Sequence, residues 1–239
     1  MVLARSVISE VVVVVPAKDE EDLLPACLES VLRAARVLAE EAPAVGVGVT
    51  LLLDGCTDGS AGVAARWPQV RAVHAEAGGA GAARRLAVEH ALVQAASRAE
   101  RVWIATTDAD SRVPRDWLVE HLALAESGVG LVLGTVEPDP ADLDAERLAA
   151  WHAAHRLADG HGHVFGANLG VRADAYLAAG GFPVRSSGED TALALAVKAL
   201  GVRWRATDGC RVVTSGRLRG RARGGFADYL TASAPLPSA

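Results

Sequence analysis

Short apolar runs rich in β-branched residues recur along the first half of the chain, and a polar loop follows each of them. Such runs predict buried strands, whereas apolar positions three and four apart predict helices. The predicted strands are Val7–Val15, Val47–Leu53, Val70–Val73 and Arg101–Thr106, and helices are predicted from Asp19 onward and from Gly81 to about Ala96. This alternation predicts an α/β fold with a mostly parallel sheet and right-handed crossovers.

The pattern becomes less regular after Pro114. Helices are predicted over Arg115–Glu126, from Ala141 to about Asp159, from Ser187 to Gly201, and from Phe226 onward, and extended segments over Val129–Val136 and Arg203–Val213. We find no internal repeat. The sequence therefore predicts one continuous α/β architecture rather than a repeated array.

Polar loops follow Val15, Leu53, Val73 and Thr106, and a parallel sheet places such loops along one edge. The loop after Thr106 carries Asp108 and Asp110, which an extended backbone directs to the same side. Hard divalent cations prefer oxygen ligands and often use one or two carboxylates together with substrate phosphates. The pair predicts such a site; the alternative is an Asp-rich turn that caps the helix beginning near Pro114.

Composition limits the class of protein further. The chain has 239 residues, of which 51% are apolar, and its formal charge of −5 argues against general nucleic-acid binding. Three cysteines without metal-like spacing predict a reduced, cytoplasmic protein. No apolar stretch approaches the roughly 20 residues of a membrane span, so a transmembrane segment is not expected. Contact with a membrane surface and the oligomeric state are left open.

Seven motifs occur in an order that resembles family 2 glycosyltransferases with the GT-A fold. They are Val-Pro-Ala-Lys-Asp-Glu-Glu (15–21), Leu-Asp-Gly-Cys-Thr-Asp-Gly-Ser (53–60), Gly-Ala-Ala-Arg-Arg (81–85), Asp-Ala-Asp (108–110), Gly-Ala-Asn-Leu-Gly-Val-Arg (166–172), Gly-Gly-Phe-Pro (180–183) and Gly-Glu-Asp (188–190). The resemblance covers residues from about 11 to 215. It implies one three-layer GT-A domain over 1–239, with a nucleotide-sugar-binding half at about 7–111, an acceptor half at 112–230 and a flexible tail at 231–239.

The resemblance also implies an activity: metal-dependent transfer of a sugar, with inversion, from a UDP- or GDP-sugar to an unidentified acceptor. Asp190 is similar to the catalytic base, and Asp108 and Asp110 to the residues that face the ribose or ligate Mg²⁺ or Mn²⁺. The nucleotide-sugar residues would be Pro16, Ala17, Glu20, Asp54, Arg84, Asp108 and Asp110, with Asn168 and Glu189 on the acceptor side. Chemistry supports the same roles, because a cation offsets charge on a diphosphate leaving group and a carboxylate can accept the acceptor's proton.

Three other functions remain open. A retaining GT-A transferase would not use Asp190 as a base, and a non-catalytic nucleotide-sugar binder would show affinity without turnover. A sugar nucleotidyltransferase is disfavoured, because Pro16–Asp19 lacks the Gly-rich loop of that class. Gly188–Thr191 is also a plausible helix N-terminus without catalytic function.

Two features are not explained by the resemblance. The segment 212–221 lacks the histidine that many GT-A enzymes use as a further metal ligand, and it carries arginines instead. We expect Arg217, with Arg219 or Arg221, to contact the donor diphosphate; a basic surface loop that extends to Arg223 is the alternative. His152, His155, His161 and His163 are the second feature, and contact with the acceptor is favoured over a structural zinc site because no cysteine completes a ligand set.

Overall fold

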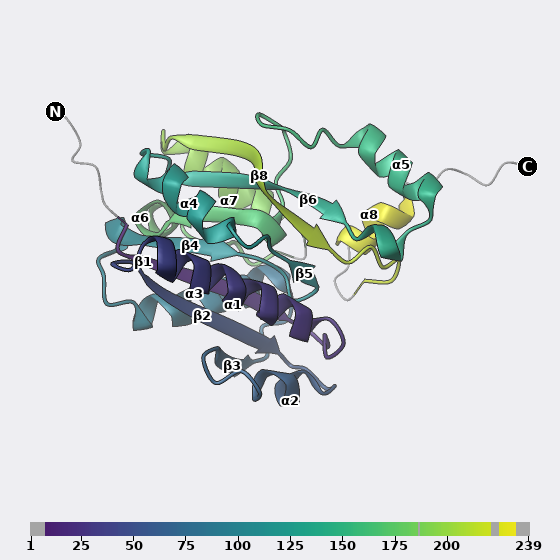
Figure 1. Ribbon diagram of the computed structural model, residues 1–239, viewed down its shortest axis with the longest axis horizontal. Coiled ribbons are helices and arrows are strands. Elements are labelled where there is room, and N and C mark those ends of the chain that lie inside the picture. The colour runs from purple at the N-terminus through teal and green to yellow at the C-terminus, as the bar shows by residue number, and fades with distance from the viewer. Residues whose placement is uncertain (1–7, 186, 221–224, 233–239) are drawn as a thin grey trace, which may run out of the picture.

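An eight-stranded sheet runs through the computed structural model, which describes residues 8–185, 187–220 and 225–232 (Figure 1). Its order is β3-β2-β1-β4-β7-β6-β8-β5. The strands are β1 (Glu10–Ala17), β2 (Gly46–Asp54), β3 (Arg71–Ala75), β4 (Val102–Thr106), β5 (Ser111–Arg112), β6 (Leu131–Pro138), β7 (Leu169–Arg172) and β8 (Trp204–Thr214). The predicted α/β class with a mostly parallel sheet is confirmed.

The strand β1 is buried on both of its faces, which explains its run of valines. It pairs in parallel with β2 and β4, so that Val13 lies beside Val49 on one side and Ala105 on the other. Val11, Val13 and Val15 pack in the core beneath α1, whereas Val12 and Val14 pack in the core beneath α3. Parallel strands covered on both faces need such continuous apolar runs, and the two cores define a three-layer structure.

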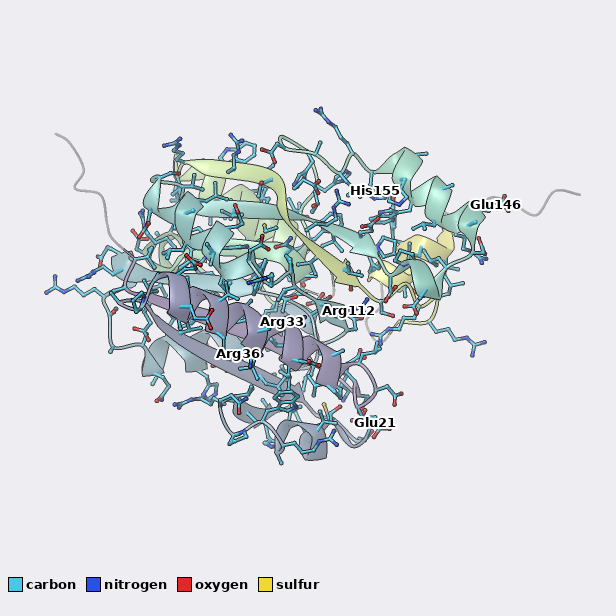
Figure 2. The ribbon with its side chains drawn as sticks, in the orientation of Figure 1. Glu21, Arg33, Arg36, Arg112, Glu146 and His155 are labelled. Atoms are coloured by element: carbon cyan, nitrogen blue, oxygen red, sulfur yellow. The ribbon has the colours of Figure 1, made fainter. Side chains whose placement is uncertain are left out.

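The helices cover the two faces of the sheet. They are α1 (Leu24–Glu41), α2 (Ser60–Ala64), α3 (Ala80–Gln94), α4 (Trp117–Glu126), α5 (Ala145–Ala154), α6 (Ala173–Ala178), α7 (Glu189–Ala199) and α8 (Phe226–Ala232), with short 3₁₀ turns at Ala99–Arg101, Pro140–Asp142 and Gly166–Asn168. The helices α1 and α4 share one core, and α3, α6 and α7 share the other. Arg33 and Arg36 project outward from α1 (Figure 2).

The second half of the sheet departs from the parallel pattern. The strand β7 is antiparallel to both β4 and β6, and β5 is antiparallel to β8. These pairings join the last strands to the parallel half in one sheet. The short elements α2 and β5 were not predicted, because five and two residues carry too little periodicity.

The predicted helix over 141–159 is shorter than expected. Pro140–Asp142 forms a separate 3₁₀ turn, and α5 begins only after Asp144, whose carboxylate accepts a hydrogen bond from the Arg147 N–H at 2.8 Å. Ser, Thr, Asn and Asp at this position satisfy helix N–H groups. The backbone is extended again at His155.

Within the described residues, no helix is long and apolar enough to cross a membrane. The predicted tail at 231–239 lies outside the described residues from 233 onward, as do the first seven residues of the chain.

Candidate active site

The turn after β4 carries Asp108 and Asp110, and we call it the acidic turn. Residues at the end of β8 hold it in place. Asp110 Oδ1 accepts hydrogen bonds from the hydroxyls of Thr214 at 3.2 Å and Ser111 at 3.3 Å. The Ser215 N–H donates to the Asp110 carbonyl at 3.0 Å. Ser111 pairs with Thr214 across β5 and β8, so the end of β8 fixes the second aspartate of the Asp-Ala-Asp motif.

The helix α1 supports this turn from beneath. The Cys27 thiol donates to the Asp108 carbonyl at 3.2 Å, and the Ser30 hydroxyl accepts from the Val113 N–H at 3.1 Å. Burial, followed by the charge of Asp110, raises the pKa of Cys27, so this thiol stays protonated and acts as a donor. Two residues on one helix face therefore brace both ends of the acidic turn.

Arg84 connects the acidic turn to the start of α7. Its guanidinium is buried and donates to the carboxylates of both Asp108 and Glu189. Burial acts to lower the pKa of Arg84, but the charges of Asp108 and Glu189 outweigh it and raise that pKa above its usual value. Burial likewise raises the pKa of Glu189, and Arg84 opposes that rise. One cation thus holds acids from two distant segments.

Two glycines leave room for the Arg84 guanidinium, because neither carries a side chain. A Cβ on Gly81 would lie 2.9 Å from the Pro183 carbonyl oxygen and 3.0 Å from the Glu189 Cβ. A Cβ on Gly166 would lie 2.5 Å from the Arg84 guanidinium carbon. Glycine at both positions lets α3, α7 and the segment before β7 converge on Arg84.

Asp190 lies in the first turn of α7, and its carboxylate is oriented by two backbone N–H groups. Oδ2 accepts from Gly166 at 2.8 Å, and Oδ1 accepts from Thr191 at 2.6 Å. Gly188 precedes the helix with φ of +72°, a conformation that glycine adopts without steric cost. Asp190 is also close enough to Arg84 for its charge to raise the pKa of that guanidinium.

Arg217 reaches back from the end of β8 to the acidic turn. Its guanidinium pairs with both carboxylate oxygens of Glu20, one of them at 2.7 Å, and Nη2 lies 2.9 Å from Asp110 Oδ2. The side chain is 26% exposed. Arg219 is exposed, and Arg221 and Arg223 lie outside the described residues. Arg217 therefore packs against Glu20 and Asp110 rather than forming part of a solvated surface loop.

The acids around Arg217 carry more negative charge than the arginine can balance. Burial, followed by the charge of Asp108, raises the pKa of Asp110 to about 6, while Arg217 opposes that rise and Glu20 adds to it. A set of carboxylate oxygens with excess negative charge is the donor set that Mg²⁺ or Mn²⁺ prefers. The residues present at this turn fit a divalent cation.

The remaining predicted donor residues lie at the same edge of the sheet. Pro16 and Ala17 end β1, and Asp54 ends β2. The Asp54 carboxylate accepts hydrogen bonds from the backbone N–H groups of residues 77, 78 and 79, at 2.6, 3.2 and 3.3 Å. It therefore fixes the loop that leads into α3, and its contact with a nucleobase stays a prediction.

Asn168 is fully buried. Its amide nitrogen donates to the carbonyls of Thr135 and Cys210, both at 2.8 Å, and its oxygen accepts from the Trp117 indole at 3.0 Å. These bonds lie where the pairing of β6 and β8 shifts register between Gly134 and Val136. Asn168 thus satisfies backbone groups at an irregularity of the sheet, and its contact with an acceptor stays a prediction.

Three of the four histidines lie together, because the ring centroid of His163 is 4.9 Å from that of His155 and 5.8 Å from that of His161. His152 lies 3.2 Å from Glu137, the His155 ring bonds the Trp151 carbonyl at 2.9 Å, and the His161 ring bonds the Leu133 carbonyl at 3.1 Å. Among the described residues, the group of three close potential metal ligands is instead Asp19, Cys56 and Asp58. Both of these aspartates already accept hydrogen bonds from backbone N–H groups of neighbouring loops. We interpret this group as a set of structural contacts that holds the loops after β1 and β2 together.

Sequence reasoning did not find the partners of the predicted acids. Glu20 with Arg217, Gly166 with Asp190, and Cys27 with Asp108 pair segments that are far apart in the chain. The Gly-Ala-Asn motif at 166–168 is the signal that could have indicated Gly166, because a glycine beside a predicted catalytic segment often permits a close backbone approach.

A parallel half-sheet extended by antiparallel strands, with an acidic turn at its edge, defines a GT-A glycosyltransferase fold. Residues 12–172 match the sequence model described as "Glycosyl transferase family 2", and the chain belongs to this family of glycosyltransferases. No curated protein matches the chain.

Solved structures show the same fold. A mannosyltransferase from Pyrobaculum calidifontis, PcManGT, in complex with GDP-Man and Mn²⁺, superposes with a TM-score of 0.62 at 21% identity, covering 93% of this chain and 68% of that one. TarS 1–349 from S. aureus superposes with a TM-score of 0.61 at 13% identity, covering 94% and 70%. TarS 1–349 in complex with UDP gives 0.59 at 14% identity, covering 87% and 61%. This chain therefore spans 61–70% of the length of these neighbours.

Proposed function

We propose that this protein transfers a sugar from a UDP- or GDP-sugar to an acceptor hydroxyl, with inversion at the anomeric carbon and with a divalent cation. The observation that carries the proposal is the position of Arg84. Its buried guanidinium joins Asp108 of the acidic turn to Glu189, which directly precedes Asp190. This arrangement holds Asp108, the acid proposed to face the donor, near Asp190, the carboxylate proposed to act as the base.

The donor half of the reaction needs positive charge near a diphosphate. Asp108 and Asp110 would hold the cation, with Glu20 nearby, and the cation would offset charge on the leaving diphosphate. Arg217 already lies against Asp110 and Glu20. A planar guanidinium pairs with phosphate oxygens as well as it does with a carboxylate. Arg217 can therefore leave an acid and contact the diphosphate. The Mn²⁺ and GDP-Man in the PcManGT structure and the UDP in a TarS structure support this class of donor.

The acceptor half needs a base that is held in place. In a direct displacement, the acceptor oxygen forms a bond to the anomeric carbon while the bond from that carbon to the diphosphate oxygen breaks. The acceptor proton passes to Asp190, and the nucleoside diphosphate leaves with the bonding electron pair. The N–H groups of Gly166 and Thr191 orient the Asp190 carboxylate, and such orientation favours a proton transfer at one defined position.

A screen of nucleotide sugars by thermal shift, with and without Mn²⁺, tests donor binding. A ligand that binds the folded state raises the apparent stability by about 2.7 kcal/mol at a hundred times its Kd. We expect a UDP- or GDP-sugar to raise the melting temperature in the presence of Mn²⁺. The absence of any shift with every nucleotide sugar would contradict the proposed donor class.

The configuration of the transferred sugar, read by NMR, tests inversion. Inversion supports Asp190 as the base, whereas retention would exclude the direct displacement described above. A donor that binds and is never consumed, with either water or any acceptor, would support a non-catalytic binder instead.

A further inference from the structure

The strand β4 ends in a buried threonine on the face of the sheet that α3 covers. Side chains along a strand alternate between its two faces. Val102 and Ile104 pack in the core beneath α3, and Thr106 follows them on the same face, fully buried. Its hydroxyl donates a hydrogen bond to the Gly166 carbonyl at 2.6 Å and lies 3.4 Å from the Leu169 carbonyl. The last side chain of β4 on this face therefore bonds the segment that precedes β7.

Gly166 connects this threonine to the proposed base. Its N–H donates to Asp190 Oδ2 at 2.8 Å, while its carbonyl accepts from Thr106. Glycine has wide freedom in both backbone dihedrals, so contacts from outside the residue must fix the direction of its N–H. A residue with less freedom does not fit here, because a Cβ would meet the Arg84 guanidinium. The orientation of the Gly166 N–H therefore depends on the hydrogen bond that Thr106 makes to the Gly166 carbonyl.

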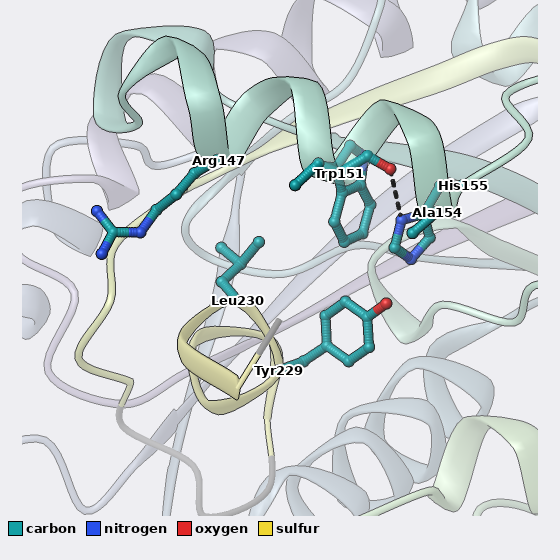
Figure 3. Close-up of a pocket in the computed structure, with 7 residues that line it drawn as sticks. Arg147, Trp151, Ala154, His155, Tyr229 and Leu230 are labelled. Carbon is teal, nitrogen blue, oxygen red and sulfur yellow. Dashed lines mark hydrogen bonds between the residues drawn. The ribbon is translucent and has the colours of Figure 1, made fainter. Parts of the chain in front are cut away.

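The residue before Gly166 is held by ring contacts. The ring centroid of Phe165 lies 6.4 Å from that of Trp151 and 5.7 Å from that of His163. Trp151 itself packs beside His155 at the end of α5 (Figure 3). These contacts place the Phe165 side chain, and ring packing of this kind does not set the direction of the peptide groups that follow. The Thr106 hydroxyl supplies that directional contact.

The next residue along the chain is a natural comparison. Thr107 is as fully buried as Thr106, but its hydroxyl has no hydrogen-bond partner within the part of the chain that the structure describes. Removing a paired hydroxyl leaves its buried partner unsatisfied, whereas removing an unpaired one leaves no partner behind. Two adjacent threonines thus carry equally buried hydroxyls, of which one bonds the segment that orients Asp190.

We propose that Thr106 is a positioning residue for the transfer reaction. Its hydroxyl fixes the Gly166 peptide, and the Gly166 N–H in turn holds the Asp190 carboxylate where it accepts the acceptor's proton. The inference rests on the proposed function, because it needs Asp190 to be the base. Thr106 takes no proton itself and acts through Gly166. The end of β4 would then position both the base and the acidic turn that directly follows it.

Thr106→Val removes the hydroxyl and keeps a branched side chain of similar size. The assay is release of nucleoside diphosphate, with water as the acceptor, from the UDP- or GDP-sugar that the thermal-shift screen identifies. We expect kcat to fall about ten- to a hundredfold, since a misplacement of about 1 Å can cost about 10²-fold. The KM for the donor should stay at the parent value, because the lost orientation matters in the transition state. Thr106→Ser keeps the hydroxyl and should return kcat close to the parent value.

Thr107→Val is the matched control and should keep the parent kcat and donor KM. Hydrogen exchange of the Gly166 amide, followed by NMR, reads the proposed contact without turnover. Exchange should be faster in Thr106→Val than in the parent, Thr106→Ser and Thr107→Val. Thr106→Ala also lacks the hydroxyl and replaces Thr106→Val in both measurements if the valine variant does not fold.

Three results would overturn the inference. They are a parent-like kcat in a folded variant without the Thr106 hydroxyl, a loss of kcat that Thr106→Ser does not restore, and an equal loss in Thr107→Val. Asp190→Asn in the same assay separates this inference from the proposed function. If Asp190→Asn loses turnover and Thr106→Val does not, the role of Thr106 alone is refuted. If Asp190→Asn turns over at the parent rate, the proposed base and the role of Thr106 are refuted together.

Discussion

Arg217 lies 2.9 Å from Asp110, so that an arginine just after the last strand offsets part of the negative charge of the acidic turn after β4. The same guanidinium holds Glu20. Arg217 thus faces Glu20 and Asp110, whereas Arg84 faces Asp108 and Glu189. Binding of a metal and a diphosphate would therefore release Arg217 from the carboxylates and leave it free to contact phosphate oxygens.

Replacement of Arg217 by alanine should weaken binding of UDP or GDP by about ten- to a hundredfold, because a charge-assisted hydrogen bond contributes about 1.5–3 kcal/mol. Calorimetric titration in the presence of Mn²⁺ measures the affinity. Arg219→Ala is the control, since Arg219 is exposed in the same loop. An unchanged affinity in Arg217→Ala would remove this residue from the donor site.

The Asp110→Asn variant should lose the stabilisation that Mn²⁺ and nucleotide together produce, because the cation loses a charged ligand. Thermal shift across a Mn²⁺ titration provides the measurement. Asp159→Asn should behave as the parent, since Asp159 pairs with Arg205 and makes no contact with the acidic turn among the described residues. If both variants respond to Mn²⁺ as the parent does, the metal site lies elsewhere.

Loss of Arg84 should lower the free energy of unfolding by about 3–5 kcal/mol, since removing one partner leaves buried charges uncompensated. Asp108 and Glu189 are the two acids left unpaired. Urea unfolding of Arg84→Ala measures the loss. Arg85→Ala on the same helix removes an exposed pair with Glu89 and should cost less than about 1 kcal/mol. Equal stability of the two variants would show that the Arg84 pairs contribute little.

His121 should make the fold sensitive to acid. It is fully buried and accepts a hydrogen bond from the Trp103 indole at 3.1 Å, and burial lowers its pKa to about 4. Between this value and the usual pKa of about 6.5, the unfolded chain binds a proton that the folded chain does not, so stability falls as pH falls. The expected contribution of His121 is a loss of about 3 kcal/mol between pH 7 and pH 4.

Unfolding of the parent and of His121→Phe, each measured from pH 7 to pH 4, isolates this effect from other titrating groups. The parent should lose more stability than the variant by about the stated amount. Parallel pH profiles would show that His121 titrates normally in the folded protein.

Local patterns predicted the parallel half of the sheet well. The strand β1 has five consecutive buried valines and β4 is buried throughout, while β2 is buried from Val49 onward; such runs are visible without knowledge of the fold. The strand β7 was harder to predict from the sequence, because it has only four residues and directly follows a 3₁₀ turn. Its antiparallel direction depends on contacts with distant strands.

The individual acids of the site could be predicted, but their partners could not. Asp108, Asp110 and Asp190 stand in short motifs, whereas Glu20 meets Arg217 across 197 positions of the chain. Nothing in either local segment specifies that contact. Asn168 illustrates the same limit of sequence-based prediction. Its motif indicates a functional segment, but the motif does not reveal that the side chain is buried where β6 and β8 meet.

The Asp190→Asn substitution tests the proposed reaction most directly. The release of nucleoside diphosphate from the donor sugar, with water as the acceptor, can be followed by a coupled assay without knowledge of the natural acceptor. We expect donor affinity to be retained and turnover to fall by about 10²–10⁴-fold, the usual contribution of a positioned general base. Turnover at the parent rate in Asp190→Asn would contradict the assignment of Asp190 as the base.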